Sequence, residues 1–84
     1  EKLDLSNNEF NSSSGYSITK TISLLPKLKH MNLANNHLNL DACLELVYKA
    51  KEKMMSRLNL SRNYITEHEA KTLQSFSPIV ICHI

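Results

Sequence analysis

Residues 28–38 read LKHMNLANNHL, and this stretch decides the fold because the rest of the chain repeats its pattern. Met31 and Leu33 alternate with less apolar neighbours, so both side chains point to one face of a short strand. Asn36 follows at a turn, where its side-chain amide can bond backbone groups that a tight bend would otherwise bury without partners. The stretch therefore predicts a strand, a turn held by Asn36, and a chain that returns inward at Leu38.

Two other segments carry the same pattern. Residues 3–10 read LDLSNNEF and residues 55–65 read MSRLNLSRNYI, so Asn8 and Asn63 take the place of Asn36. The three asparagines are 28 and then 27 residues apart (8 to 36, then 36 to 63). A single unit cannot bury its own apolar face, so this regular period predicts stacked copies. We expect Asn8, Asn36 and Asn63 to form a structural asparagine ladder.

Each turn is followed by apolar residues at helical spacing. The spacing predicts helices over residues 16–25 and 40–55, the second with Met54 on its inward face, and Pro26 ends the first. Residues 11–15, NSSSG, are predicted to form a polar loop. A third helix begins at a capping box of Thr66 and Glu69. The residues ten positions after the ladder asparagines are expected to be buried: Ile18, Leu46 and Leu73.

The frame L-x-x-L-x-L-x-x-N-x-L, followed by a helix, resembles the leucine-rich repeats of the ribonuclease-inhibitor-like subfamily. Residues 63–76, NYITEHEAKTLQSF, match that subfamily's N-x-L-x-x-x-G-A-x-x-L segment, with Glu69 where glycine is common. The resemblance implies an α/β solenoid with short parallel β-strands on a concave face and helices on a convex face. It implies one leucine-rich repeat domain over residues 1–84, with repeats at about 1–27, 28–54 and 55–76, and we expect a fragment of a longer protein.

The last residues are apolar at almost every position. They leave two alternatives, a shortened terminal strand over residues 77–84 or a chain that leaves the solenoid, and we favour the strand. Alternation from Ile79 predicts that Ile79 and Ile81 point inward, with Cys82 on the concave side as the more reactive thiol. Because neither end carries a polar cap, we also expect self-association through uncapped ends.

Outward-facing strand residues are predicted to line up in three columns across the repeats. Such a surface can be a partner-binding strip, basic along one edge and amide-rich in the middle, or it can be solvated surface with no partner. The columns are Lys2, His30 and Arg57; Asp4, Asn32 and Asn59; and Ser6, Ala34 and Ser61.

Composition argues against several other classes of function. The net charge of +2 does not require a polyanionic partner, and the cluster of Lys49, Lys51, Lys53 and Arg57 lacks the interleaved aromatics of a nucleic-acid site. The histidines and cysteines have no metal-ligand spacing, and no catalytic motif is present. We therefore expect no enzyme activity, no cofactor, no metal and no nucleic-acid partner. No apolar run reaches membrane-spanning length, so we also expect a cytoplasmic protein with no membrane partner.

These observations predict a protein–protein interaction scaffold that binds another protein, with an acidic surface, through its concave β-face. The resemblance leaves one alternative open. In that alternative the chain is part of a GTPase-activating or other enzyme-regulating leucine-rich repeat protein whose active elements lie outside these residues.

Overall fold

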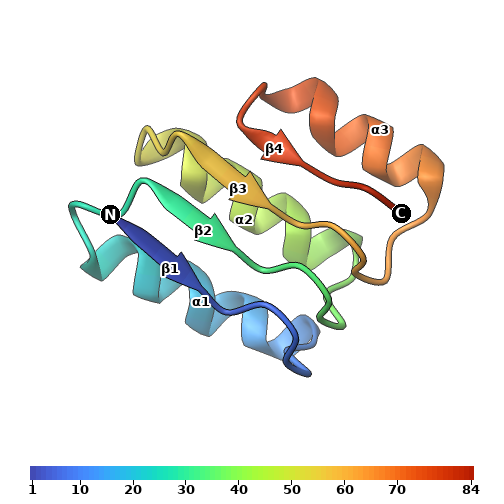
Figure 1. Cartoon of the computed structure of the whole chain (residues 1–84), viewed down its shortest axis with the longest axis horizontal. Helices are drawn as coiled ribbons and strands as arrows, with labels where there is room; N and C mark the ends of the chain where they lie inside the picture. Colours follow the sequence, from blue (N-terminus) through green and yellow to red (C-terminus); the bar gives the residue numbers. More distant parts are fainter.

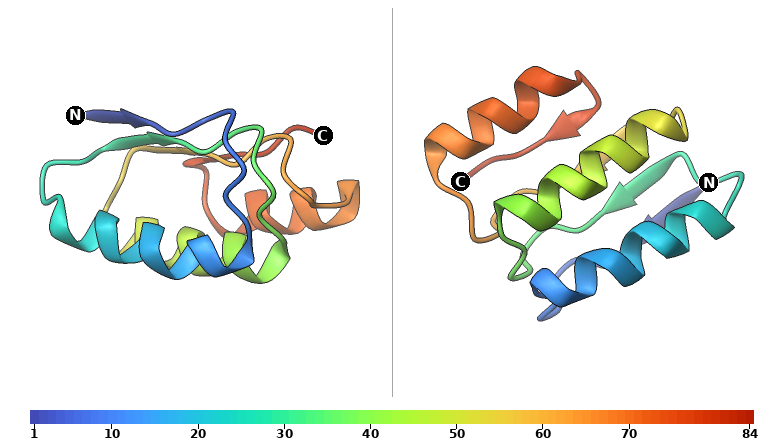
Figure 2. Two further views of the ribbon diagram at one scale, coloured as in Figure 1. Left: turned by 90° about the horizontal axis from the view of Figure 1, so that it is seen from below. Right: turned by 180° about the vertical axis from the view of Figure 1, so that it is seen from behind.

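The computed structural model describes all 84 residues, which form one parallel sheet with helices on one side (Figure 1). The strand order β1-β2-β3-β4 follows the sequence, and one helix connects each strand to the next. Figure 2 shows two layers, with the strands on one side and all three helices on the other. The predicted α/β class with a parallel sheet is confirmed, and the arrangement is compatible with a leucine-rich repeat fold. The elements are β1 (Lys2–Asp4), α1 (Ser12–Leu24), β2 (His30–Asn32), α2 (Leu40–Glu52), β3 (Arg57–Asn59), α3 (Glu67–Phe76) and β4 (Val80–Ile81).

The hydrophobic core lies between the two layers. Met31 and Leu33 are buried, as the alternation in residues 28–38 predicts. The sheet register pairs Leu3 with Met31 and Met31 with Leu58, so apolar side chains stack from strand to strand beneath the sheet. The residues ten positions after the ladder asparagines lie on the helices and are buried in this core, as predicted: Ile18, Leu46 and Leu73.

Helix α1 begins at Ser12, so the prediction of a polar loop over residues 11–15 is wrong. Asn11 is the N-cap: its Oδ1 accepts a hydrogen bond of 3.1 Å from the Ser13 N–H. The Ser14 hydroxyl in turn accepts one of 3.1 Å from the Asn11 N–H, which completes a capping box. Serine and asparagine favour both turns and helix starts, and here the reciprocal bonds select the helix start.

Gly15 lies inside α1 where this helix meets α2. A Cβ atom added at Gly15 would lie 3.1 Å from the Ala42 Cβ, closer than ordinary van der Waals contact. Gly15 therefore permits the close approach of the two helices. We expect Gly15→Val to lower the free energy of unfolding by about 1–3 kcal/mol, the usual effect of overpacking a filled core.

Urea denaturation monitored by circular dichroism measures this loss. Ser17→Val is the matched control because Ser17 is exposed on the same helix and receives the same β-branched side chain. Equal destabilisation by the two substitutions would show that the β-branched side chain itself, rather than the contact with Ala42, causes the loss.

Helix α2 ends at Glu52, three residues before the predicted end. Met54 adopts the left-handed conformation, with φ of 57°, and its N–H donates to the Lys51 carbonyl at 3.1 Å. The Met55 N–H then donates to the Ala50 carbonyl at 2.9 Å, a pattern that closes a helix C-terminus. Met54 is 78% exposed, so its prediction as a core residue is wrong, and Met55 enters the core instead.

Strand β4 forms, but with its faces reversed relative to the prediction. Val80 and Cys82 are buried, whereas Ile79 and Ile81 are only partly buried, so the predicted inward pair is wrong by one residue. β4 pairs Val80 with Leu58 and Ile81 with Asn59. Cys82 points to the core, so the prediction that it lies on the concave side is wrong, and burial raises the pKa of its thiol. Burial likewise raises the pKa of Cys43, to about 12.

Candidate functional site

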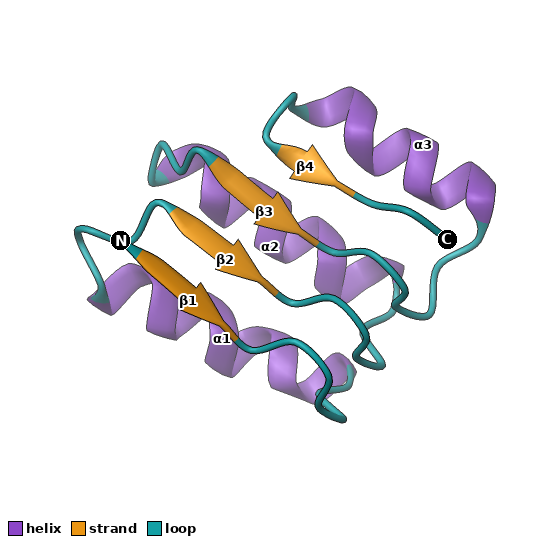
Figure 3. Ribbon diagram, in the orientation of Figure 1, coloured by secondary structure: helices purple, strands orange, loops and turns teal.

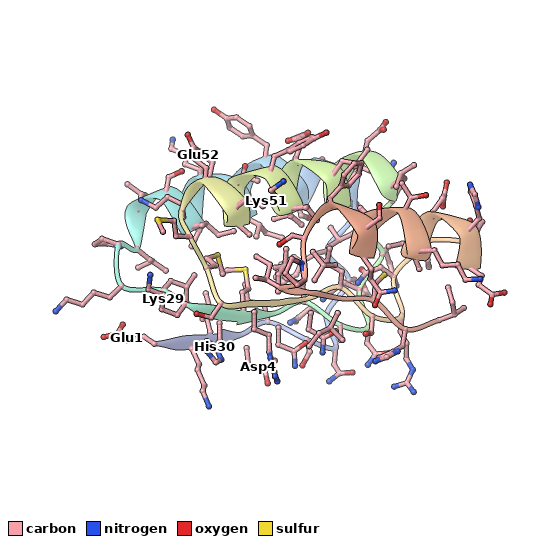
Figure 4. All side chains as sticks on the ribbon, turned by 90° about the horizontal axis from the view of Figure 1, so that it is seen from above. Glu1, Asp4, Lys29, His30, Lys51 and Glu52 are labelled. Atoms are coloured by element: carbon pink, nitrogen blue, oxygen red, sulfur yellow. The ribbon has the colours of Figure 1, made fainter.

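The face of the sheet that no helix covers is called the open face here. His30 and Asp4 project from it, on the side opposite Lys51 and Glu52 of α2 (Figure 4). The register places Lys2 beside His30 and His30 beside Arg57. Because neighbouring strands lie about 4.8 Å apart, these three side chains form one line across the sheet. We call Lys2, His30 and Arg57 the basic row.

A second row lies next to it along the strands. The same register places Asp4 beside Asn32 and Asn32 beside Asn59, and β4 extends the row with Ile81. Sequence reasoning missed Ile81 because it assigned that residue to the core. A groove of about 260 Å³ runs over both rows. Its lining residues are Lys2, Leu3, Asp4, His30, Met31, Asn32, Arg57, Asn59 and Ile81.

The second row also stabilises the turns that follow the strands. Asn32 Oδ1 accepts a hydrogen bond of 3.0 Å from the Ala34 N–H, and Asn59 Oδ1 accepts one of 3.0 Å from the Ser61 N–H. These are Asx turns, which Asp and Asn form readily. The amide nitrogens of Asn32 and Asn59 donate to no group within the protein, so they are free to bond a partner.

Asp4 makes the equivalent turn with stronger bonds. Its Oδ1 accepts from the Ser6 N–H at 2.9 Å and from the Ser6 hydroxyl at 2.6 Å. Both bonds favour the ionised carboxylate, so they hold the pKa of Asp4 below its ordinary value. The open face therefore carries one fixed negative charge, at the β1 end of the second row.

The third predicted column does not form an exposed strip. Ala34 is 9% exposed and Ser61 is 6% exposed, and only Ser6 is partly accessible. The prediction that Ala34 and Ser61 face outward is therefore wrong. Both residues lie past the strand ends at Asn32 and Asn59, where the turns bury them. Ser61 instead accepts a hydrogen bond of 3.0 Å on its hydroxyl oxygen from the His83 N–H.

The turns beyond the strand ends lie side by side (Figure 3). The Asn36 side chain joins two of them. Its Oδ1 accepts from the N–H groups of Asn8 and Phe10, at 3.1 and 3.2 Å. Its Nδ2 donates to the carbonyl of Leu5 at 3.1 Å and to that of Leu33 at 3.0 Å, with a longer bond of 3.3 Å to Ala34. Asn36 is 2% exposed, so these bonds satisfy an amide that water barely reaches.

The other two asparagines make fewer bonds. Asn63 Oδ1 accepts from the Leu38 N–H at 3.0 Å, while its Nδ2 donates to the carbonyls of Leu33 and Leu60, both at 3.0 Å, and of Ser61 at 3.3 Å. Asn8 is exposed, and its Nδ2 donates only to carbonyls within its own turn. The residue before each asparagine adopts positive φ, which tightens every turn in the same way: Asn7 at 60°, Asn35 at 59° and Arg62 at 56°.

Other kinds of site are absent from the chain as described. No group of three or more His, Cys, Asp or Glu side chains is placed to hold a metal ion. None of the helices is both long enough and apolar enough to cross a membrane. The basic row, the second row and the groove over them are therefore the candidate site that the sheet presents.

Comparison with known proteins adds one finding. The family model for Leucine Rich Repeat matches residues 1–21, which include β1, the turn at Asn8 and most of α1. This match supports a leucine-rich repeat protein and, in general, a role in protein interaction, since these repeats are typically non-enzymatic interaction modules. Comparison with curated proteins and with solved structures gives no match.

Proposed function

We propose that this chain is a protein-binding module that recognises its partner through the open face of the sheet. The observation that carries the proposal is the groove of about 260 Å³ in which the basic row lies beside the free amide nitrogens of Asn32 and Asn59. Cationic side chains next to hydrogen-bond donors suit a partner that presents carboxylates.

The proposal includes the finer assignment to a ribonuclease-inhibitor-like solenoid whose concave side is the open face. Two observations support it. The asparagines recur every 27–28 residues, and each unit consists of a strand, a turn and a helix on one side of the sheet. In stacked repeats of this kind, equivalent strand positions form continuous columns, which offer a partner a surface wider than any single repeat.

Charge reversal of the basic row is expected to slow association with the partner. A partner is first captured on the tagged chain and identified, and association rates are then measured by surface plasmon resonance. His30→Glu combined with Arg57→Glu should lower the association rate constant by roughly tenfold, because surface charges act chiefly on the rate of encounter.

The matched control is Lys51→Glu combined with Lys53→Glu, which reverses basic side chains of the α2 end instead. This control should change the rate much less, and raised salt should narrow the difference between the two variants. A larger effect of the α2 pair would place the binding surface on the helices and contradict the proposal.

A further inference from the structure

The two edges of the sheet, β1 and β4, differ in how their backbone groups are satisfied (Figure 1). The carbonyls of Ile79 and Ile81 face β3, so the N–H groups of Val80 and Cys82 face the outer side of β4. The Val80 N–H donates to the carbonyl of Ser77 at 3.3 Å. The Cys82 N–H donates to Oε1 of Gln74, also at 3.3 Å. Both outward N–H groups are therefore taken by the chain itself, so this edge is protected against pairing with another strand.

The edge at β1 has no such protection. The Leu5 N–H donates to the Asn32 carbonyl at 2.8 Å, so Leu5 faces β2. Successive residues of a strand form their backbone bonds on opposite sides, which means that Lys2 and Asp4 face away from β2. Because β1 is the first strand of the sheet, no strand of the chain pairs with these groups. Lys2 and Asp4 each offer one N–H and one carbonyl to a further strand.

The sequence of β1 is complementary to itself in the antiparallel direction. The strand reads Lys2-Leu3-Asp4, so two copies that meet with Leu3 opposite Leu3 place Lys2 of each copy opposite Asp4 of the other. Both charged side chains are exposed on the open face, and opposite charges on facing residues stabilise a strand pair. In the same register, the outward groups of Lys2 and Asp4 can form four backbone hydrogen bonds between the copies.

Apolar surface lies beside this edge as well. A groove of about 330 Å³ lies between the turn after β1 and α1, and its apolar lining consists of Leu5, Phe10 and Ile18. Two antiparallel edges with the same face of each sheet upward are related by a two-fold axis perpendicular to the sheet. The helices of both copies then lie on the same side, with the two α1 helices next to each other, where they cover part of the groove.

We propose that a second copy of the chain pairs with β1, antiparallel about Leu3, and that the resulting symmetric dimer joins the two four-stranded sheets into one. The basic row of each copy then continues into Asp4, Asn32 and Asn59 of the other copy, so the dimer presents one open face of twice the width. Association ends at two copies, because the protected edge at β4 does not extend the sheet.

The test is sedimentation equilibrium of the whole chain over a range of concentrations. The parent should pass from the mass of one chain to that of two, without larger species. Lys2→Asp and Asp4→Lys should each raise the Kd of the dimer by about tenfold, because like charges then face each other at both pairs. An equimolar mixture of these two variants should return to the Kd of the parent, since every carboxylate at the interface again faces an ammonium group.

Two further variants separate charge from folding. Lys51→Asp makes the same change of charge on α2, where Lys51 is exposed, and should leave the Kd unchanged. Asp4→Asn keeps the Asx turn that Asn32 and Asn59 form at the same position, but removes both ion pairs. It should raise the Kd by about threefold.

Amide exchange locates the interface, because the N–H groups of Lys2 and Asp4 should exchange more slowly in the dimer than in the monomer. A single chain mass at every concentration overturns the proposal. So does a mixture that associates no better than its two components, when both give the circular dichroism of the parent. A dimer in which the Lys2 and Asp4 amides exchange as in the monomer places the contact on another surface and also overturns it. None of these measurements involves the partner of the proposed function, so that proposal stands or fails separately.

Discussion

Replacement of Leu33 by alanine is expected to lower the free energy of unfolding by about 2–5 kcal/mol. Leu33 is fully buried and belongs to the single cluster of core side chains between the sheet and the helices. Leucine-to-alanine changes at such sites lose the transfer free energy of the removed atoms and leave a cavity that the neighbours fill only in part. A domain of this size has a total stability of about 5–15 kcal/mol, so the variant is expected to melt far below the parent or to be unfolded at 37 °C.

Thermal and urea denaturation measure the loss directly. Leu60→Ala should behave like Leu33→Ala, because Leu60 is equally buried at the matching position after β3. Leu24→Ala is the control: it removes the same atoms from a side chain that is 70% exposed, and it should cost less than about 0.5 kcal/mol. Parent-like melting of Leu33→Ala would contradict the repeat frame on which the fold rests.

Replacement of Asn36 by alanine should destabilise the chain by about 1–3 kcal/mol. The change removes both the acceptor for two backbone N–H groups and the donor to three carbonyls, in a place with little access to water. Buried polar groups that lose their partners keep the full cost of desolvation. Because these groups belong to two successive turns, the loss loosens the contact between the first and second repeats.

The other asparagines provide an internal scale for this effect. Asn63→Ala should cost somewhat less than Asn36→Ala, since Asn63 is less buried and makes one bond fewer, and Asn8→Ala should cost least. Asn36→Asp is informative as well, because a carboxylate oxygen would replace Nδ2 and face three carbonyl oxygens. If all four variants melted at the temperature of the parent, the asparagine spacing would be coincidental.

Local periodicity in the sequence determines the order of strands, turns and helices. Met31 and Leu33 alternate at period two, while Leu46 and Ala50 recur at helical spacing, and both patterns depend only on which side chains share a face. The capping box of Thr66 and Glu69 is confirmed, because it too depends only on residues three positions apart. The Thr66 N–H donates to the Glu69 carboxylate at 3.0 Å, and the Glu69 N–H donates to the Thr66 hydroxyl oxygen at 3.2 Å. The basic row follows as well, because repeat lengths of 28 and 27 residues bring Lys2, His30 and Arg57 into register.

The predictions that were wrong concern segments whose local sequence pattern is compatible with two structures. The run Ile79 to Cys82 is apolar at every position, so alternation cannot choose its inward face, and pairing with Leu58 and Asn59 makes the choice. Residues 11–15 suit a loop or a helix start, and the packing of Gly15 on Ala42 accompanies the helix start. Ala34 follows the strand pattern in the sequence but lies past the end of β2, where the turn buries it.

Tertiary structure alone brings exposed aromatic side chains of the three helices together. Tyr16, Tyr48 and Phe76 come eight, twelve and thirteen residues after the asparagines of their repeats, so no sequence period connects them. They become neighbours only when α1, α2 and α3 pack side by side over the sheet. The sequence by itself therefore determines which residues share a face within one strand or helix, because that depends on backbone geometry over a few residues. Contacts between elements depend on the angle and offset at which the elements pack, and only the folded structure sets these.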